Sequence, residues 1–183
     1  MDTSDVMDAS DVETAVDGGC SPDGGCLVVD RHGARMGHPA MIVPGVMEAL
    51  QAVGAAVAAG PVPTRTLDLV NLRASQINGC GVCLLGDVHA AKQHGETDDR
   101  LALVAAWRDA PFFSGAERAA LALTEAVTRL SDRADPVPDD VWHEAARHYD
   151  EEALAALVVA IANINVWNRL NVATGQVAGA YEW

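Results

Sequence analysis

The sequence predicts an all-α protein, because three of its features favour helices over strands. Alanine, the residue with the highest helix propensity, occurs 33 times among the 183 residues. From about residue 36 onward, apolar residues recur at helical spacing between stops made by Gly and Pro. Sustained alternation of apolar and polar residues is absent from the sequence, as is any Asn-Gly or Asp-Gly hairpin between β-branched runs. We therefore expect a compact bundle of about six to seven helices.

In the first half of this region, each helix has a recognisable start or stop. Val43-Pro44-Gly45 introduces the first helix, and Gly60 with the prolines around it closes it. Asn78-Gly79 ends the second, because both residues tolerate the left-handed conformation that closes helices. A third helix starts near Cys80 and stops before Gly95.

The remaining helices also have capping signals. Thr97 precedes two aspartates, which favour the start of a helix. Ser114 and Glu117 have the spacing of a capping box, and Asp150 caps the last helix. In chain order, the predicted helices cover approximately residues 45–59, 65–77, 80–94, 97–109, 115–130, 139–148 and 151–174.

Acidic residues are concentrated at the start of the chain. The formal net charge is -14, and residues 1–30 contain eight acidic residues and no Lys or Arg. This segment is also rich in Ser and Gly, so it cannot bury enough apolar surface to offset the entropy of ordering. We expect residues 1–35, which include Cys20 and Cys26, to be a flexible acidic leader, and residues 36–183 to be the helical domain.

Charge and hydropathy exclude several classes of partner. The chain has no cluster of Lys and Arg with which to bind nucleic acid or an anionic membrane. The longest uninterrupted apolar run, Ala153 to Ala162, is shorter than the roughly 20 residues that cross a bilayer. The acidic N-terminus does not resemble a signal peptide. We therefore expect a cytoplasmic protein with no nucleic-acid or membrane partner, in which the cysteines are reduced, metal-bound or catalytic rather than structural disulfides.

The sequence Cys80-Gly81-Val82-Cys83 is the local pattern with the clearest chemical meaning. At a helix start, the free backbone amides stabilise a thiolate, and a second thiol three residues away can resolve the oxidised product. Half of a zinc site and an inert buried pair are the alternatives. A zinc site would need two further ligands, and no His pair with suitable spacing follows.

Several longer segments resemble one known family. The run from Leu69 to Cys83 (LVNLRASQINGCGVC) resembles the alkylhydroperoxidase D-like branch of the carboxymuconolactone decarboxylase superfamily. The resemblance extends over about residues 36–175. Other segments that carry it are GET at 95–97, WRDAP at 107–111, ERAAL at 117–121 and INVWNR at 164–169.

This resemblance implies an all-α fold, homo-oligomers such as trimers or hexamers, and reduction of hydroperoxides. It also implies that Cys83 attacks the substrate and Cys80 resolves the product. The electron donor would be a dithiol, in this family a lipoyl-type group. We expect neither a bound cofactor nor a metal ion.

The chain departs from the family pattern at two positions. The family has a glutamate twelve residues before the first cysteine and a histidine four residues after the second, and here these are Asp68 and Asp87. An aspartate is a weaker base near neutral pH, and its charge opposes a neighbouring thiolate. His89 could substitute only if the helix is distorted near Gly86, because a regular helix turns it about 120° away from Cys83.

We therefore interpret the sequence as a thiol-dependent peroxidase or disulfide oxidoreductase with Cys83, Cys80, Asp68, Asp87 and His89 as candidate site residues. The alternative is a catalytically weakened or specialised member that acts as an oligomeric binding or redox-sensing scaffold. Lactone decarboxylation is a third, less favoured possibility, because the cysteine pair indicates the redox branch.

Overall fold

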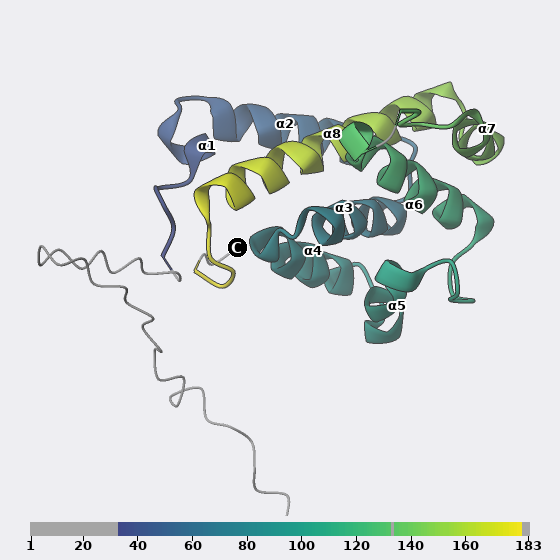
Figure 1. The fold of residues 1–183 in the computed structure, drawn as a ribbon, viewed down its shortest axis with the longest axis horizontal. Coiled ribbons are helices and arrows are strands. Elements are labelled where there is room, and N and C mark those ends of the chain that lie inside the picture. The colour runs from purple at the N-terminus through teal and green to yellow at the C-terminus, as the bar shows by residue number, and fades with distance from the viewer. Residues whose placement is uncertain (1–32, 133, 181–183) are drawn as a thin grey trace, which may run out of the picture. The chain divides into compact units, whose positions relative to one another are not determined.

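The computed structural model describes residues 33–132 and 134–180, so most of the predicted leader, with Cys20 and Cys26, lies outside the described residues. The described residues form helices and no strand, which confirms the predicted all-α class (Figure 1). The α-helices are α1 Pro39–Ile42, α2 Val46–Ala58, α3 Thr64–Asn78, α4 Gly81–Gln93, α5 Asp98–Leu103, α6 Gly115–Thr128, α7 Asp139–His148 and α8 Glu151–Thr174, and the short 3₁₀ helices are η1 Val104–Ala106 and η2 Leu130–Asp132.

Helices α3 and α8 form the centre of the fold. Helix α3 packs against α4, α6 and α8, and α8 also packs against α2 (Figure 1). Helix α8 is long and apolar enough to cross a membrane by length and composition alone, with a mean hydropathy of 1.5. Its apolar stripe is used here for packing, because Leu154, Leu157 and Ile161 are buried in the core with Val70 of α3 and Leu123 of α6.

The local signals in the sequence correctly locate most helix ends. Gly79 ends α3 with a φ of 66°, the left-handed conformation that glycine adopts without a steric penalty. Ser114 and Glu117 form the complete capping box of α6. The side chains of Thr97 and Asp150 accept hydrogen bonds from backbone amides at the starts of α5 and α8.

Two parts of the fold differ from the prediction. Helix α5 ends at Leu103 rather than near Asp109. The chain continues as the 3₁₀ helix η1 and a turn, and the carbonyls of Trp107, Arg108 and Ala110 in that turn accept hydrogen bonds from the Arg118 guanidinium of α6. The second difference is α1, a short helix that the sequence pattern did not predict as a separate element.

A buried carboxylate joins α3, α6 and the turn after η1. Glu125 of α6 accepts hydrogen bonds from Arg73 of α3, from the Trp107 indole and from Arg108. Burial alone would raise the pKa of Glu125, but these donors outweigh it and hold the pKa below its ordinary value. The ionised carboxylate therefore fixes the position of α3, the helix that precedes the cysteine pair.

Candidate functional site

The two cysteines lie where α3 ends and α4 begins, and they form a disulfide. Gly79 reverses the chain, the Cys80 amide donates to the Ser75 carbonyl, and Cys80 becomes the N-cap of α4. The Cys80 sulfur accepts a hydrogen bond of 3.3 Å from the Cys83 amide. The Cα atoms of the pair are 5.3 Å apart. The first turn of α4 thus presents its unpaired amides to the sulfurs, an arrangement that stabilises a thiolate after reduction.

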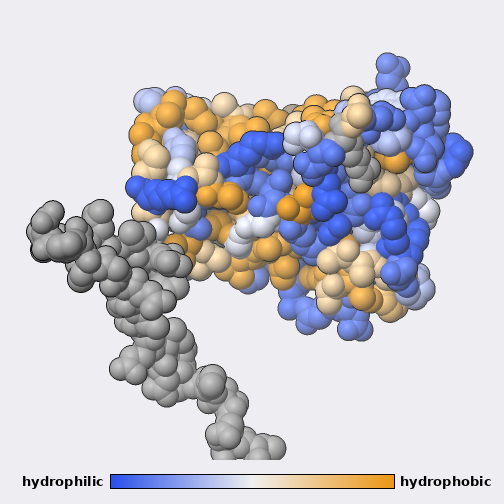
Figure 2. Space-filling view, viewed as in Figure 1, coloured by the Kyte–Doolittle hydropathy of each residue, from blue (hydrophilic) through white to orange (hydrophobic). Residues whose placement is uncertain are grey.

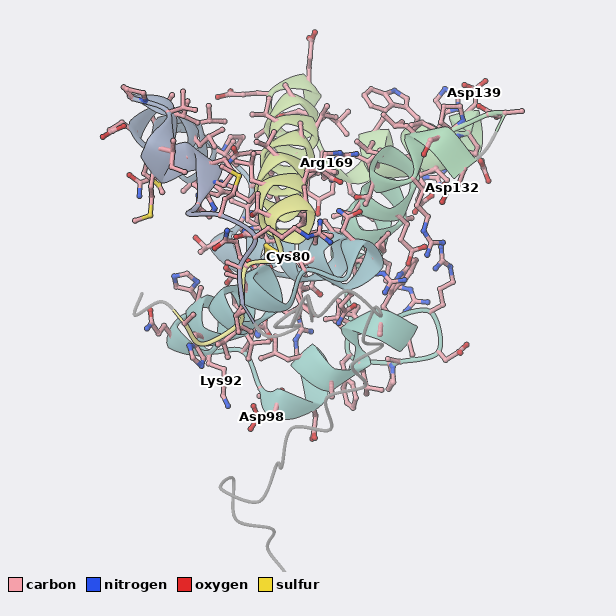
Figure 3. The ribbon with its side chains drawn as sticks, turned by 60° about the vertical axis from the view of Figure 1, so that its left-hand side comes forward. Cys80, Lys92, Asp98, Asp132, Asp139 and Arg169 are labelled. Carbon is pink, nitrogen blue, oxygen red and sulfur yellow. A yellow bond between two sulfur atoms is a disulfide. The ribbon has the colours of Figure 1, made fainter. Side chains whose placement is uncertain are left out.

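The two sulfurs differ in access. Cys80 is 1% exposed and packs with Ala74 and Ile164, next to α8 (Figure 3). Cys83 is 8% exposed and lines a pocket of about 540 Å³. A molecule in this pocket therefore meets Cys83 first. Besides Cys83, the pocket is lined by His38, Met41, Met47, Gln51, Asn71, Val82, Gly86, Asp87, Asn163, Ile164, Trp167 and Asn171.

Asp87 lies one helical turn after Cys83 and lines the same pocket. Its carboxylate accepts a hydrogen bond of 2.7 Å from the Ser75 hydroxyl, which in turn accepts one from Asn168. Burial raises the pKa of Asp87 from 3.8 to about 7; the Ser75 hydrogen bond opposes this shift, and the charge of Asp68 adds to it. The sequence suggested a weak base that remains charged at neutral pH, whereas the folded environment gives this carboxyl a pKa in the range of a histidine.

Asp68 is buried and is not among the residues that line the pocket. Its carboxylate lies 2.8 Å from His94 Nδ1, at the C-terminal end of α4. Burial raises the pKa of Asp68, and the His94 contact opposes that shift. The structure thus places Asp68 close enough to act electrostatically on Asp87, and its hydrogen-bond partner is His94.

His89 is exposed on α4 and is not among the residues that line the Cys83 pocket. Helix α4 is continuous from Gly81 to Gln93, so no break near Gly86 turns His89 toward the cysteines. Of the five candidate residues, the structure brings together Cys80, Cys83 and Asp87, keeps Asp68 near Asp87, and leaves His89 on the exposed surface.

Two further polar residues at the pocket were not predicted from the sequence. His38, 7% exposed, caps α1, and its ring centroid lies 5.8 Å from that of Trp167. Asn171 of α8 donates a hydrogen bond of 3.4 Å to the Cys83 sulfur. Only a folded structure reveals these contacts, because the two residues are far from the cysteines in sequence and match no local motif. The one available signal was the excess of asparagines in α8.

Two of those asparagines, Asn165 and Asn168, form a polar face of α8 toward α3. Asn78 of α3 donates hydrogen bonds to both Asn165 and Asn168. Asn168 donates to Ser75, the residue that holds the Asp87 carboxylate. Arg169, whose position on α8 is labelled in Figure 3, donates to the side chain of Asn165. The network connects the core to the site and leaves few rotamers open to the side chains that surround Asp87.

Comparison with known proteins gives consistent matches. The model of the carboxymuconolactone decarboxylase family matches residues 44–126. An uncharacterised protein of Bacillus subtilis, YdfG, is 40% identical over 117 residues, which are 63% of this chain and 77% of YdfG. The match to the family model includes the whole α3–α4 segment that carries the cysteine pair.

Solved structures share the fold. A protein of unknown function from Agrobacterium tumefaciens, suggested to be the antioxidant defence protein AhpD, aligns with a TM-score of 0.75 and 30% identity over 81% of this chain and 100% of its own. The debrominase Bmp8 aligns with a TM-score of 0.67 and 25% identity over 75% of this chain and 73% of its own. With its helical fold and cysteine pair, the chain belongs to the carboxymuconolactone decarboxylase family, with AhpD-like structural neighbours.

Proposed function

We propose that the protein is a thiol-dependent peroxidase that reduces hydroperoxides through Cys83 and Cys80. The observation that carries this proposal is the bonded cysteine pair at the start of α4, with one sulfur facing a pocket and the other buried behind it. Membership of the family and the suggested antioxidant role of the Agrobacterium neighbour also support the proposal.

The reaction begins with the reduced pair. The Cys83 thiolate attacks the outer oxygen of a hydroperoxide, so that an S–O bond forms, the O–O bond breaks, and the alcohol leaves with a proton. The Cys80 thiol then attacks the Cys83 sulfenic acid, which forms the disulfide and releases water. A dithiol donor returns the pair to the reduced state by thiol–disulfide exchange and is itself oxidised to a disulfide.

Asp87 takes the proton-transfer role in this scheme. A carboxyl with a pKa of about 7 exchanges protons readily at neutral pH, so it accepts the Cys83 proton and returns it to the leaving oxygen. Thiol and carboxyl titrate as a coupled pair, because a charge on one disfavours a charge on the other. The Ser75 hydroxyl keeps the Asp87 carboxyl in place while its charge changes.

Steady-state turnover tests the proposal. The assay contains the full chain, an organic hydroperoxide and a lipoyl-type dithiol, and it follows the loss of both substrates. We expect the wild type to turn over, and we expect Cys83→Ser and Cys80→Ser each to lower the rate at least about 100-fold, because the dithiol cycle needs both sulfurs. Replacement of both Cys20 and Cys26 with serine should leave the rate unchanged. If the wild type and Cys83→Ser consume hydroperoxide equally, the proposal is wrong.

A redox-sensing scaffold is the second candidate, and the replacement of the family histidine with Asp87 favours it. In such a protein a hydroperoxide would oxidise the cysteine pair, but small dithiols would not reduce the pair again at a useful rate. The assay described above separates the two functions, since a sensor gives one turnover and an enzyme gives many. Asp87→His, which restores the family residue, should then raise the rate of turnover if proton transfer limits it.

A further inference from the structure

The Cys83 sulfur accepts a hydrogen bond from a side chain that lies outside the part of the chain matched by the family model. The match ends at residue 126, and Asn171 lies in α8 beyond it. Asn171 is 4% exposed, and its Nδ2 donates both to Cys83 Sγ at 3.4 Å and to the Trp167 carbonyl at 3.0 Å. If the amide were turned over, its oxygen would face these two acceptors. The orientation of this amide therefore decides whether Cys83 meets a donor or an acceptor.

Another group is needed to keep Asn171 in this orientation. Its Oδ1 is buried and accepts no hydrogen bond of ordinary length from any residue of 33–132 and 134–180. An unpaired buried carbonyl oxygen is unfavourable, so a nearby N–H donor would stabilise the arrangement. The imidazole of His38 lines the same pocket and interacts with the Asn171 side chain.

The tautomer of His38 supplies such a donor. His38 Nδ1 accepts a hydrogen bond of 3.2 Å from the Ala40 amide, so this nitrogen carries no proton. In the neutral ring the proton is then on Nε2, which can only donate. Burial lowers the pKa of His38 and keeps the ring neutral near pH 7, although the Asn171 contact opposes part of this shift. His38 is therefore a fixed donor and not an acid–base group.

We propose that His38 is a positioning residue: its Nε2–H donates to Asn171 Oδ1 and so holds the Asn171 N–H on the Cys83 sulfur, where it stabilises the thiolate once the disulfide is reduced. The inference rests on the proposed role of Cys83 as the attacking thiol. It gives the chain a neutral donor at the sulfur, although Asp87 occupies the position of the family histidine. His38, like Asn171, lies outside residues 44–126, so segments on both flanks of the family match complete the site.

The Cys83 pKa tests this relation directly. The reduced full chain is alkylated with iodoacetamide between pH 5 and 10, and peptide mass spectrometry follows Cys83 separately from the other thiols. Besides Cys83 and His38, the titratable side chain that lines the pocket is Asp87, and it stays unchanged in every variant. We expect Asn171→Leu and His38→Phe each to raise the Cys83 pKa by about one unit, since each removes the donor from the thiolate.

A double variant distinguishes positioning from an independent effect. If His38 acts only through Asn171, His38→Phe adds no further shift of the Cys83 pKa in the Asn171→Leu background. His89→Phe, at the exposed histidine of α4, is the matched control and should leave that pKa unchanged. An unchanged Cys83 pKa in His38→Phe, or shifts that add in the double variant, would overturn the proposal.

A measurement on the wild type covers the possibility that His38→Phe does not fold. Nitrogen NMR of the histidine rings reports the tautomer directly, and we expect His38 to be neutral with its proton on Nε2 throughout pH 6.5 to 8. A proton on Nδ1, or an imidazolium at pH 7, would contradict the chain of hydrogen bonds. Neither measurement uses a hydroperoxide, so a failure of the proposed peroxidase activity would be seen separately, in the turnover assay.

Discussion

Asp87 shows how far burial alters the chemistry of a residue. From its residue type alone, an aspartate in place of a histidine is expected to be charged near neutral pH, because the ordinary pKa of an aspartate is far below 7. In the pocket its pKa is about 7, because burial disfavours the charged form more than the Ser75 hydrogen bond favours it. The aspartate therefore changes its charge in the same pH range as the histidine it replaces. The position can be found in the sequence, but its pKa cannot be predicted there, because that pKa depends on groups from α3 and α4 packed together.

The raised pKa also has a consequence for stability. The folded protein binds the Asp87 proton more tightly than the unfolded chain, so the free energy of unfolding falls as the pH rises from about 4 to 7. Asp87→Asn removes this titration and keeps an acceptor for the Ser75 hydroxyl. We expect the variant to be more stable than the wild type at pH 8, by up to about 4 kcal/mol, and to lose this advantage near pH 4.

Urea unfolding at several pH values checks this expectation. Asp139→Asn, on the exposed first turn of α7, is a suitable control, because a solvated aspartate should change stability by only about 0.5 kcal/mol. A stability difference between Asp87→Asn and the wild type that does not vary with pH would show that the carboxyl has its ordinary pKa in the folded protein.

At the scale of helices, features that depend on neighbouring residues could be predicted from the sequence, whereas features that depend on distant contacts could not. The Asn78-Gly79 stop and the capping box at Ser114 are both confirmed. They could be predicted because the groups that form them lie within a few residues of one another. The turn after η1 was predicted as helix; it is held by the Arg118 guanidinium, which comes from the next helix. His38 was missed for the same reason, since its role depends on Trp167 and Asn171, more than 120 residues away.

The position of α3 depends on Glu125. Glu125→Gln removes the charge that balances Arg73, whose side chain is 13% exposed. We expect a loss of about 3 kcal/mol in the free energy of unfolding at pH 7, because a buried guanidinium without its partner is strongly destabilising. The low pKa of Glu125 means that the wild type keeps this stabilisation above pH 4.5 and loses it as the pH falls through the lower folded value.

Chemical denaturation at pH 7 measures the effect. Glu144→Gln is the matched control, because Glu144 pairs with Arg147 and His148 on the surface of α7, where an ion pair contributes less than about 1 kcal/mol. Equal losses in the two variants would contradict a structural role for Glu125 beyond that of a surface ion pair.

At the scale of the whole molecule, the fold class and the family could be predicted from the sequence, whereas self-association is still a prediction. Large apolar side chains are exposed on α1, α2 and α8, and Figure 2 shows hydrophobic residues gathered over α1 and α2. Such a patch is typical of an interaction surface. The exposed residues are Met41, Ile42, Val53, Val159, Val166 and Val172.

Light scattering after size exclusion gives the oligomeric state. With a chain of 19.1 kDa, we expect the mass of a trimer or a hexamer. Val166→Glu should lower that mass, because a charge in an apolar interface disfavours association. A wild-type mass of about 19 kDa at micromolar concentration would contradict the expectation.

The most direct test of the central claim is a single oxidation by one equivalent of an organic hydroperoxide. In the fully reduced wild type, we expect peptide mapping to find one new disulfide, between Cys80 and Cys83. In Cys80→Ser, a sulfenic acid on Cys83 should accumulate and react with dimedone, because the resolving thiol is missing. Two results would contradict the assignment of Cys83 as the attacking sulfur. One is a sulfenic acid that forms on Cys80 in the Cys83→Ser variant as fast as it forms on Cys83 in the Cys80→Ser variant. The other is a loss of thiols that Cys20 and Cys26 account for.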